Sequence, residues 1–545
     1  MRRDLRVLAG AAIAAGVVAG TVLADPGDGP AITPVPSANT KAAGYAPASV
    51  LAGGLTQRIV AAGANAVENP SGIVTHYGYE NDTPSPDNPA VPQMVPANLS
   101  SPAEAQKTEP DKNTYLVFKN GLAGASSTYD YGTQFLFQGH ENGAGSPKQG
   151  YLTRINLQAD TAHRVTLMAT QDDQGHPLAP IDGSTWDPWA QRILLTTENT
   201  GAPTYAATPG YPSVVHDVSG ALGRGGYEGI QDDGDGNLWI VEDIGGSNKP
   251  NTSAKAPNSY VYRYVPATPG DLANGKLQAL QVLDAHGQPI TFADQTALNG
   301  ADQLALHAYG NSFDTRWVTV HDTAVDGTAP YVANPLARAA GATPFKRPEN
   351  GVFRPGTKFQ QFFFTETGDT NATSPENGDP STGAGGAGGW GSLFRLVQSG
   401  PSADTGRLSL FFRGNESVTG LDNITFLTAN LLTAVEDAGD GLHSQRNALD
   451  SGYVFDASRT NYAGTTNPPR WLAEGRDPSA TLDSANGGFG KNEGDNEITG
   501  AHVSDGDPGT GGVLGAKKPN WSDGHWRWFY TAQHGDNLTF EVVPK

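Results

Sequence analysis

Acidic residues recur at the ends of short apolar segments throughout this sequence. Two of these segments, NLWIVEDIGG (237–246) and NLLTAVEDAG (430–439), close in the same way, with Val-Glu-Asp, one further residue and Gly. Comparable segments elsewhere end in His140-Glu141, Glu198, Glu366 and His534. Carboxylate oxygens and imidazole nitrogens are the ligands that proteins offer to many metal cations. The repeated pattern therefore indicates metal-ion chemistry at a set of strand ends.

A second acidic residue precedes most of these segments by 14–17 positions. These upstream acids are Asp182, Glu228, Glu349 and Asp422, and Glu497 opens the last unit. Turn-forming residues lie between the two acids, so each unit is predicted to be a β-hairpin. Since a hairpin returns the end of its second strand to the start of its first, we expect Glu228 with Glu242, and Asp422 with Glu436, at one end of a sheet.

The elements that would position these acids are short strands. Apolar runs divided by Gly, Asn, Asp and Pro predict an all-β protein, and a further strand follows several hairpins, as in YVYRYV (260–265) and SLFRLV (392–397). Three or four strands in each of about six units predict a six-bladed β-propeller. Its innermost strands would bring the acids to one mouth of the central channel.

The chain is predicted to contain three regions. Residues 1–24 resemble an export signal, because the basic start MRRDLR precedes an apolar stretch that ends in Val22-Leu23-Ala24; a single membrane anchor is the alternative. Residues 25–110 are rich in Ala and Pro and are predicted to be a loosely ordered N-terminal extension. Residues 111–545 would form the propeller domain, with long loop insertions such as 373–389.

These regions predict an exported protein. The Sec or the twin-arginine route would deliver it to the periplasm or the extracellular space, with no integral membrane segment after signal removal. A formal net charge of -21 argues against a nucleic-acid partner, since phosphate backbones would be repelled. We expect a monomer that acts on a small molecule.

Carboxylates gathered at one mouth would repel one another, so they would take up protons or bind multivalent cations. Oxygen ligands at irregular spacing favour several Ca²⁺ ions, with Mn²⁺ or Fe³⁺ as alternatives. The chain has no Cys, so no thiolate ligand or thiol nucleophile is available. The stretch DDGDGN (232–237) resembles half of an EF-hand calcium loop but lacks its downstream Glu, and we expect a solvated turn there.

Five motifs resemble the PhoX-type secreted alkaline phosphatases, over residues 112–540. They are GHEN (139–142), DGSTWDPWAQRILLTTEN (182–199), YEGIQ through EDIGG to YVYRYV (227–265), RPENGVF (347–353), and EITG (497–500) with AQHGD (532–536). The resemblance implies a six-bladed β-propeller that hydrolyses phosphomonoesters with Ca²⁺ and ferric iron at the channel mouth. It also implies carboxylate ligands to the metals at Glu141, Glu198, Glu228, Glu242, Asp243, Glu349, Asp422, Glu436 and Glu497.

One position departs from the family pattern. In the resembling phosphatases a Cys that ligates iron precedes the glutamate of the TTEN-like strand, whereas this chain has Thr197 there. A hydroxyl is a poor substitute for a thiolate on Fe³⁺. The departure puts iron in doubt, but calcium requires only oxygens.

The first functional hypothesis is therefore a secreted metal-dependent phosphoric ester hydrolase. Arg347 would bind the developing negative charge on phosphorus, with Lys346 and Arg395 as alternatives, and His140 or His534 would protonate the leaving group. Another calcium-dependent propeller hydrolase, such as a lactonase or a phytase-like enzyme, is the second hypothesis. A non-catalytic calcium-binding extracellular protein is the third.

Overall fold

The computed structural model describes residues 29–41, 47–78, 83–84, 92–93, 108–144, 148–294, 296–378, 385–476 and 497–545. Strands dominate this part of the chain and the helices are short, which confirms the predicted all-β class. The predicted export signal, residues 1–24, lies outside the described residues. No helix among the described residues is long and apolar enough to cross a bilayer.

Most strands belong to antiparallel meanders, in which each strand pairs with the next one along the chain. The first meander contains β5 (Pro110–Val117), β6 (Gln134–His140), β7 (Leu152–Asn156) and β8 (Val165–Ala169). The second contains β9 (Ser184–Asp187), β10 (Arg192–Leu195), β11 (Tyr205–Ala207) and β12 (Val215–Asp217). The second begins just after Asp182, one of the predicted upstream acids, whereas the first begins with a strand that contains the unpredicted Asp111.

A nine-stranded sheet joins the next two meanders edge to edge. The third contains β13 (Tyr227–Asp232), β14 (Leu238–Glu242), β15 (Val261–Pro266), β16 (Gly275–Val282) and β17 (Phe313–Asp322). The fourth contains β18 (Gly351–Phe353), β19 (Gln361–Glu366), β20 (Ser392–Gln398) and β21 (Thr405–Arg413). The outermost strands β17 and β21 pair with each other, so two units share one continuous sheet.

The last two meanders and a few isolated elements complete the described chain. The fifth contains β22 (Leu421–Phe426), β23 (Leu431–Glu436), β24 (Ser451–Asp456) and β25 (Arg470–Ala473), and the sixth β26 (Ile498–Ser504), β27 (Arg527–Ala532) and β28 (Leu538–Pro544). A separate two-stranded pair consists of β3 (Thr83–Pro84) and β4 (Pro92–Gln93). The helices are α1 (Ser219–Leu222), α2 (Ala301–Leu306), α3 (Thr323–Asp326), α4 (Ala333–Ala339) and α5 (Gly439–Arg446), and 3₁₀ turns span Thr161–His163, Thr510–Gly512 and Trp521–Asp523.

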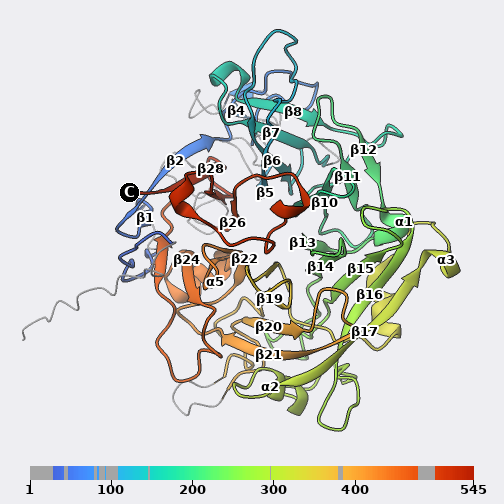
Figure 1. The fold of residues 1–545 in the computed structure, drawn as a ribbon. Coiled ribbons are helices and arrows are strands. Elements are labelled where there is room, and N and C mark those ends of the chain that lie inside the picture. Colours follow the sequence, from blue (N-terminus) through green and yellow to red (C-terminus); the bar gives the residue numbers. More distant parts are fainter. Residues whose placement is uncertain are drawn as a thin grey trace, which may run out of the picture.

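Two further strands come from the segment that we expected to be a loosely ordered extension. The strand β1 (Val50–Leu51) pairs with β25, and β2 (Leu55–Ala61) pairs with β28 along its length. Figure 1 shows the blue β2 beside the red C-terminal strand. Backbone hydrogen bonds therefore join residues 50–61 to the strands near the C-terminus, which the sequence pattern did not predict.

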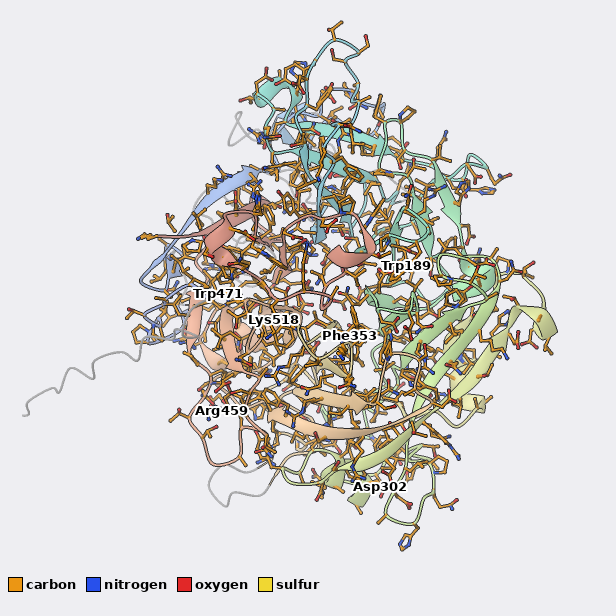
Figure 2. The ribbon with its side chains drawn as sticks, viewed as in Figure 1. Trp189, Asp302, Phe353, Arg459, Trp471 and Lys518 are labelled. Carbon is orange, nitrogen blue, oxygen red and sulfur yellow. The ribbon has the colours of Figure 1, made fainter. Side chains whose placement is uncertain are left out.

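The first strands of the six meanders meet at the centre of the molecule. β5 contacts β9, and the contacts continue through β13, β18 and β22 to β26, which contacts β5 again. Figure 1 shows the sheets arranged around this centre. Side chains fill the space between the ribbons (Figure 2), and the polar residues of the first strands are largely buried. Side chains at the ends of the six first strands are therefore brought close together.

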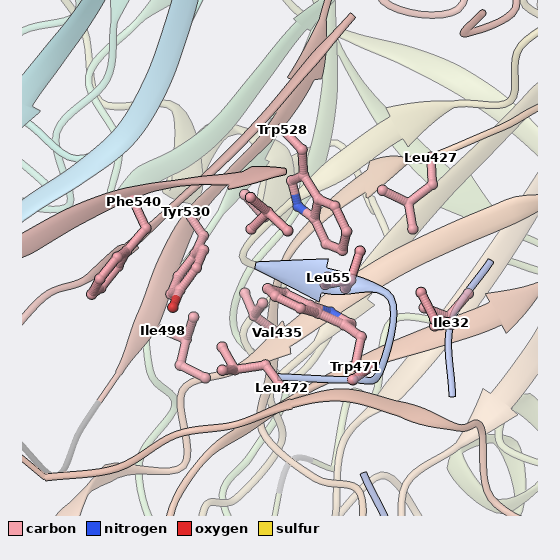
Figure 3. Close-up of a cluster of buried hydrophobic side chains, with 14 of the residues drawn as sticks. Ile32, Leu55, Leu427, Val435, Trp471, Leu472, Ile498, Trp528, Tyr530 and Phe540 are labelled. Carbon is pink, nitrogen blue, oxygen red and sulfur yellow. The ribbon is translucent and has the colours of Figure 1, made fainter. Parts of the chain in front are cut away.

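Apolar layers between neighbouring sheets hold the meanders against each other. Between the fifth and sixth, Trp471 of β25 and Trp528 of β27 lie with ring centroids 4.4 Å apart. Ile32 and Leu55 from the N-terminal segment join the same cluster (Figure 3). Burying a large apolar side chain contributes about 1.5–3 kcal/mol. The N-terminal segment is therefore part of the core.

Candidate metal centre

Nine carboxylates form one continuous group at the centre of the sheets. Four sets of three acids each place ligand oxygens within 4.8 Å of one another, and successive sets share Glu141, Glu198 and Glu228. We call this group the acid cluster; it consists of Asp111, Glu141, Asp182, Glu198, Glu228, Asp243, Glu349, Asp422 and Glu497. Seven of its members are among the nine metal ligands that the sequence predicted.

The hairpin geometry explains why these acids meet. Each of the six meanders supplies an acid in or just before its first strand: Asp111, Asp182, Glu228, Glu349, Asp422 and Glu497. The remaining acids, Glu141, Glu198 and Asp243, follow second strands. The strand register pairs Tyr227 with Glu242 and Leu421 with Glu436, so both hairpins return to the end where they began.

Small and hydroxyl-bearing residues let neighbouring first strands approach each other. A Cβ atom at Gly183 would lie 1.8 Å from the carbonyl oxygen of Glu228, so only glycine fits beside Asp182. The hydroxyl of Thr196 donates to that same carbonyl oxygen at 2.5 Å. In the fourth meander the hydroxyl of Thr365 donates to the carbonyl oxygen of Asp422 at 3.1 Å. These contacts fix the backbone that carries the acids.

Six members of the acid cluster are buried and three are partly buried, and some of their oxygens have no hydrogen-bond donor. Oδ1 of Asp182 and Oδ2 of Asp422 have no hydrogen-bond partner among the described residues. Burial, followed by repulsion from neighbouring carboxylates, raises the pKa of Asp182, Glu228 and Glu497 well above the usual range. Buried charges are stable only when they are paired or bind cations. The carboxylate oxygens of the cluster are therefore suited to bind multivalent cations.

Two cationic side chains lie within the cluster. Nε of Arg347 donates to Oδ1 and Oδ2 of Asp243 at 3.0 and 2.9 Å, and its Nη2 lies 3.0 Å from Oε1 of Glu349. Arg347 has a left-handed backbone, with φ 56°. Such strain in a non-glycine residue is often found at functional sites. Of the three predicted catalytic residues, Arg347 is the one that contacts the acid cluster.

The second cation, Lys112, was not predicted. Its Nζ donates to Oδ1 of Asn423 at 2.8 Å and to Oδ1 of Asn350 at 3.2 Å. Burial lowers its pKa to about 8, although Asp422 and Asp111 favour the charged form. The residues Asp111 and Lys112 open the first hairpin, as the other upstream acids open theirs. The long β5–β6 loop separates Asp111 from Glu141 by 30 residues and so hid the pattern.

Two of the predicted ligands face away from the cluster. Oε2 of Glu242 accepts hydrogen bonds from the backbone N–H of Tyr260 and the side chain of Asn334, at 3.0 and 2.9 Å. Oε1 of Glu436 accepts from the backbone N–H of Thr419 at 2.9 Å. Because successive side chains of a strand point to opposite faces, the next residue in each Val-Glu-Asp segment points toward the centre. Neither glutamate belongs to the acid cluster, and their role as metal ligands stays a prediction.

The other second-strand and cationic candidates also have partners elsewhere. Glu366 accepts from His307 Nε2 at 2.8 Å and from the backbone N–H of Lys346 at 2.8 Å, outside the cluster. The Lys346 Nζ lies 2.9 Å from Asp369 Oδ1. Nη2 of Arg395 donates to the carbonyl oxygen of Thr460 at 2.8 Å. None of these three residues is placed to bind a substrate at the cluster.

The two predicted histidines differ in their surroundings. His140 is fully buried, its ring nitrogens lie 3.1 Å from the hydroxyls of Thr108 and Thr153, and its ring stacks on Tyr151. Burial keeps its pKa well below the usual value. His534 Nε2 lies 3.5 Å from Oε1 of Glu109, and burial lowers its pKa to about 4. These partners of the two rings lie outside the acid cluster, and burial favours the neutral form of both.

The residues present fit calcium better than iron. The acid cluster offers oxygen donors in an irregular arrangement, which suits Ca²⁺. The hydroxyl of Thr197, at the position of the iron-ligating Cys, donates to the carbonyl oxygen of Pro203 at 3.1 Å. That bond directs the hydroxyl away from the grouped carboxylates. Neither a thiolate nor the hydroxyl of Thr197 is therefore available to bind iron at this position.

Comparisons with known proteins identify a matching family and a similar fold. The family model described as alkaline phosphatase PhoX matches residues 252–508. The structure of Pseudomonas fluorescens PhoX in complex with vanadate, a transition state analogue, superposes with a TM-score of 0.55 at 10% identity, covering 93% of this chain and 98% of that one. The structure of a GH43_1 enzyme from Xanthomonas citri aligns with 64% of this chain and 87% of its own length at 10% identity, with a TM-score of only 0.29. No curated protein matches the sequence.

The resemblance to the PhoX alkaline phosphatases is therefore confirmed. The family match supports a hydrolase of the phosphatase type. At 10% identity the structural likeness speaks for the fold alone. Substrate and metals must be argued from the residues of this chain.

Proposed function

We propose that the protein is a secreted metal-dependent hydrolase of phosphate esters, with a carboxylate-bound metal cluster at the channel mouth of a six-bladed β-propeller. The acid cluster is the observation that carries the proposal. It combines nine carboxylates, six of them buried and three partly buried, with oxygens that lack a hydrogen-bond donor, in a chain whose residues 252–508 match the PhoX family. A purely structural set of acids would be expected to have compensating donors or cations.

The closed series of contacts among the first strands supports the propeller. Six meanders begin at the centre, and the first and last of them contact each other through β5 and β26. The N-terminal β2 pairs with β28 and so adds a strand to the last meander. Such a joint between the chain ends would close the ring of blades. The 25–110 extension would then be part of the closure of the 111–545 domain.

Calcium would be held by the members of the acid cluster, and we propose several Ca²⁺ ions rather than iron. When bound, such cations polarise phosphate oxygens and supply a water-derived nucleophile. The protein's own contribution is to hold the carboxylates in place. Gln533 Nε2 donates to Asp111 Oδ2 at 3.0 Å and also to Glu141, and the hydroxyl of Thr499 donates to Asp111. These bonds, donated by residues of the sixth meander, orient two acids of the first meander toward the same space.

Arg347 is proposed to bind the phosphate group of the substrate. Its guanidinium is ion-paired with Asp243 and Glu349, and its side chain is 19% exposed, so it is the cation of the cluster with access to solvent. A planar guanidinium suits bidentate binding of phosphate oxygens. Cations bound by the two carboxylates would free the guanidinium for a substrate. Lys112, by contrast, is buried and is proposed to position Asn350 and Asn423.

We keep the remaining parts of the prediction as proposals. They are an export signal at residues 1–24, a location outside the cytoplasm, a small-molecule phosphate ester as substrate, and a monomeric state. A second candidate function is another calcium-dependent hydrolase, of the lactonase or phytase type. The specific observation in its favour is Thr197, because a site without the iron ligand need not retain phosphatase chemistry.

One experiment separates these functions. The mature chain is purified, its bound metals are measured, and a phosphomonoester, a phosphodiester and a lactone are assayed with and without chelator. We expect calcium, hydrolysis of a phosphate ester and loss of activity on chelation. Bound calcium with lactone cleavage alone would favour the second candidate, and bound calcium with no hydrolysis of any kind would indicate a non-catalytic protein.

A further inference from the structure

A second set of acids lies at the far end of two first strands. Asp187 is the last residue of β9 and Asp232 the last residue of β13. The acid cluster contains Asp182 and Glu228, which lie near the beginnings of the same two strands. Asp232 lies four residue steps along the strand from Glu228, which corresponds to about 13 Å. The two sets of acids are therefore separate sites.

Asp232 is a buried carboxylate without a hydrogen bond. Its side chain belongs to a fully buried residue, and neither Oδ1 nor Oδ2 has a hydrogen-bond partner among the described residues. The sequence led us to expect a solvated turn here, and the burial of Asp232 corrects that expectation. Most buried polar groups in proteins are hydrogen-bonded, and an unpartnered carboxylate is strongly destabilising. Something that the chain itself does not supply must compensate it.

The neighbouring turn cannot provide the missing donors, because Asp233 uses them. Oδ1 of Asp233 accepts from the backbone N–H groups of Asp235 and Asn237, at 2.9 and 3.0 Å. Its Oδ2 accepts from the side chains of Asn237 and Trp239, at 2.8 and 2.9 Å. Four donors thus converge on one carboxylate of the pair. They leave the other with none.

The charged groups that face Asp232 are themselves acidic. They are Asp187 and Asp233, and neither Asp187 nor Asp232 forms an ion pair with a basic side chain in the described part of the chain. Oδ1 of Asp187 accepts from the backbone N–H groups of Trp189 and Ala190 at 2.8 and 2.9 Å. Burial nevertheless raises the pKa of this carboxyl, against the effect of the two hydrogen bonds. Figure 2 shows Trp189 near the centre of the molecule. Two buried acids at the ends of contacting strands, one of them without any hydrogen-bond donor, form an environment for a cation.

We propose that Asp187 and Asp232 hold one calcium ion at the turn end of β9 and β13, apart from the acid cluster. The donors are oxygens from two different strands. A buried site of this kind favours Ca²⁺, since Mg²⁺ retains several waters and demands a regular octahedron. The ion would tie the second meander to the third. This site does not depend on the proposed hydrolase function.

Calcium content and terbium luminescence test the proposal on the full mature chain. The variants are Asp232→Asn and Asp187→Asn, in which the amide oxygen at 187 can still accept from the turn. Asp235→Asn is the matched control, because Asp235 lies in the same turn but is exposed and bonds Ser402. We expect either site variant to bind one calcium ion fewer than the wild type, and the control to bind the same number.

Trp239 makes the site visible to terbium, because its Nε1 donates to Asp233 next to the proposed ion. Tryptophan-sensitised terbium emission should fall in both site variants and persist in Glu228→Gln, which alters only the acid cluster. Unchanged calcium content and emission in a folded Asp232→Asn protein would overturn the proposal and indicate a buried proton instead. If Asp232→Asn fails to fold, the same readouts on Asp187→Asn decide.

Discussion

The acid cluster and a second buried group of charged side chains differ in how their charges are balanced. The second group, which we call the ion-pair network, consists of Lys249, Lys346, Asp369 and Glu376. Nζ of Lys346 lies 2.9 Å from Asp369 and 2.6 Å from Glu376, and Nζ of Lys249 lies 2.6 Å from Glu376. Two ammonium groups thus face two carboxylates, all buried. The residue after Lys346 is Arg347 of the acid cluster.

The ion-pair network also completes its hydrogen bonds. The hydroxyl of Ser374 donates to Asp369 at 2.6 Å, and the backbone N–H of Asn299 donates to Glu376 at 2.8 Å. None of its side-chain nitrogens or oxygens lacks a partner among the described residues. The acid cluster has an excess of carboxylates and donor-free oxygens instead. A group with equal numbers of opposite charges stabilises the fold, whereas a group with excess carboxylates needs bound cations to neutralise it.

The largest expected effect comes from removing one acid of the cluster. Glu228→Gln should reduce hydrolysis of the phosphate ester by on the order of a thousandfold, about 4 kcal/mol, because a shared metal ligand is lost. It should also lower the bound calcium. The same change should stabilise the chelator-treated protein, since a repelling buried charge disappears. Activity assays, metal analysis and thermal unfolding measure the three effects.

A result in which Glu228→Gln keeps its calcium and its activity would show that the acid cluster is not the metal site. The matched control is Glu416→Gln, a glutamate outside the cluster that should leave calcium content and activity unchanged. If chelator stabilised the wild-type protein, the expected repulsion among the metal-free carboxylates would also be contradicted.

Removing an acid from the ion-pair network should destabilise the fold rather than change metal binding. Glu376→Gln should reduce the free energy of unfolding by about 3–4 kcal/mol, because buried Lys249 loses its carboxylate and buried Lys346 keeps only Asp369. Calcium content should not change. Lys276→Met is the control, since Lys276 forms an exposed pair with Asp322 and should cost less than about 1 kcal/mol. Denaturant unfolding of both variants checks the difference.

The pH dependence of unfolding sharpens this contrast. Burial alone would raise the pKa of Glu376, but Lys346 and Lys249 lower it below its usual value of 4.5. The unfolded state therefore binds protons first as the pH falls, and the stability that Glu376 contributes is lost as the pH drops below 4.5 through the folded pKa. Glu376→Gln should flatten this acid limb of the stability curve. An unchanged acid limb would contradict the pairing.

Arg347 links the two regions, and its replacement should have an intermediate effect. Arg347→Gln should raise KM for a phosphomonoester roughly tenfold to a hundredfold, as expected for the loss of a charged hydrogen-bonding group. Bound calcium should be retained, because Asp243 and Glu349 lose a competing cation. Arg347→Lys should fall between the two proteins, since an ammonium cannot bind phosphate bidentately. An unchanged KM would exclude Arg347 from substrate binding.

Local patterns were enough to predict the hairpins and most of the acid cluster. Apolar runs separated by turn residues define a hairpin, and an acid at each end of it follows from the chain reversal. Other features depend on distant pairing. β2 pairs Leu55 with Pro544, and no local pattern reveals a partner so far along the chain. Asp111 was missed because its hairpin has a long loop.

Which of two adjacent acids faces the centre also lay beyond the sequence pattern. The strand period of two places neighbours on opposite faces, but it does not say which face each one takes. In β13–β14 a register irregularity between Tyr227 and Ile230 contributes to the choice. The structure turns Glu242 into the sheet and Asp243 toward the cluster. The side-chain assignment therefore depends on pairing details that composition and spacing do not contain.

The smallest expected effect tests that assignment directly. Glu242→Gln should leave calcium content and activity within about twofold of the wild type and cost less than about 1 kcal/mol, because an amide oxygen can still accept from the N–H of Tyr260 and the side chain of Asn334. Asp243→Asn, one residue along, should lower calcium binding and activity, since it alters a member of the acid cluster. Equal losses in the two variants would mean that both acids reach the metal, and that the alternation of faces does not separate a structural acid from a functional one.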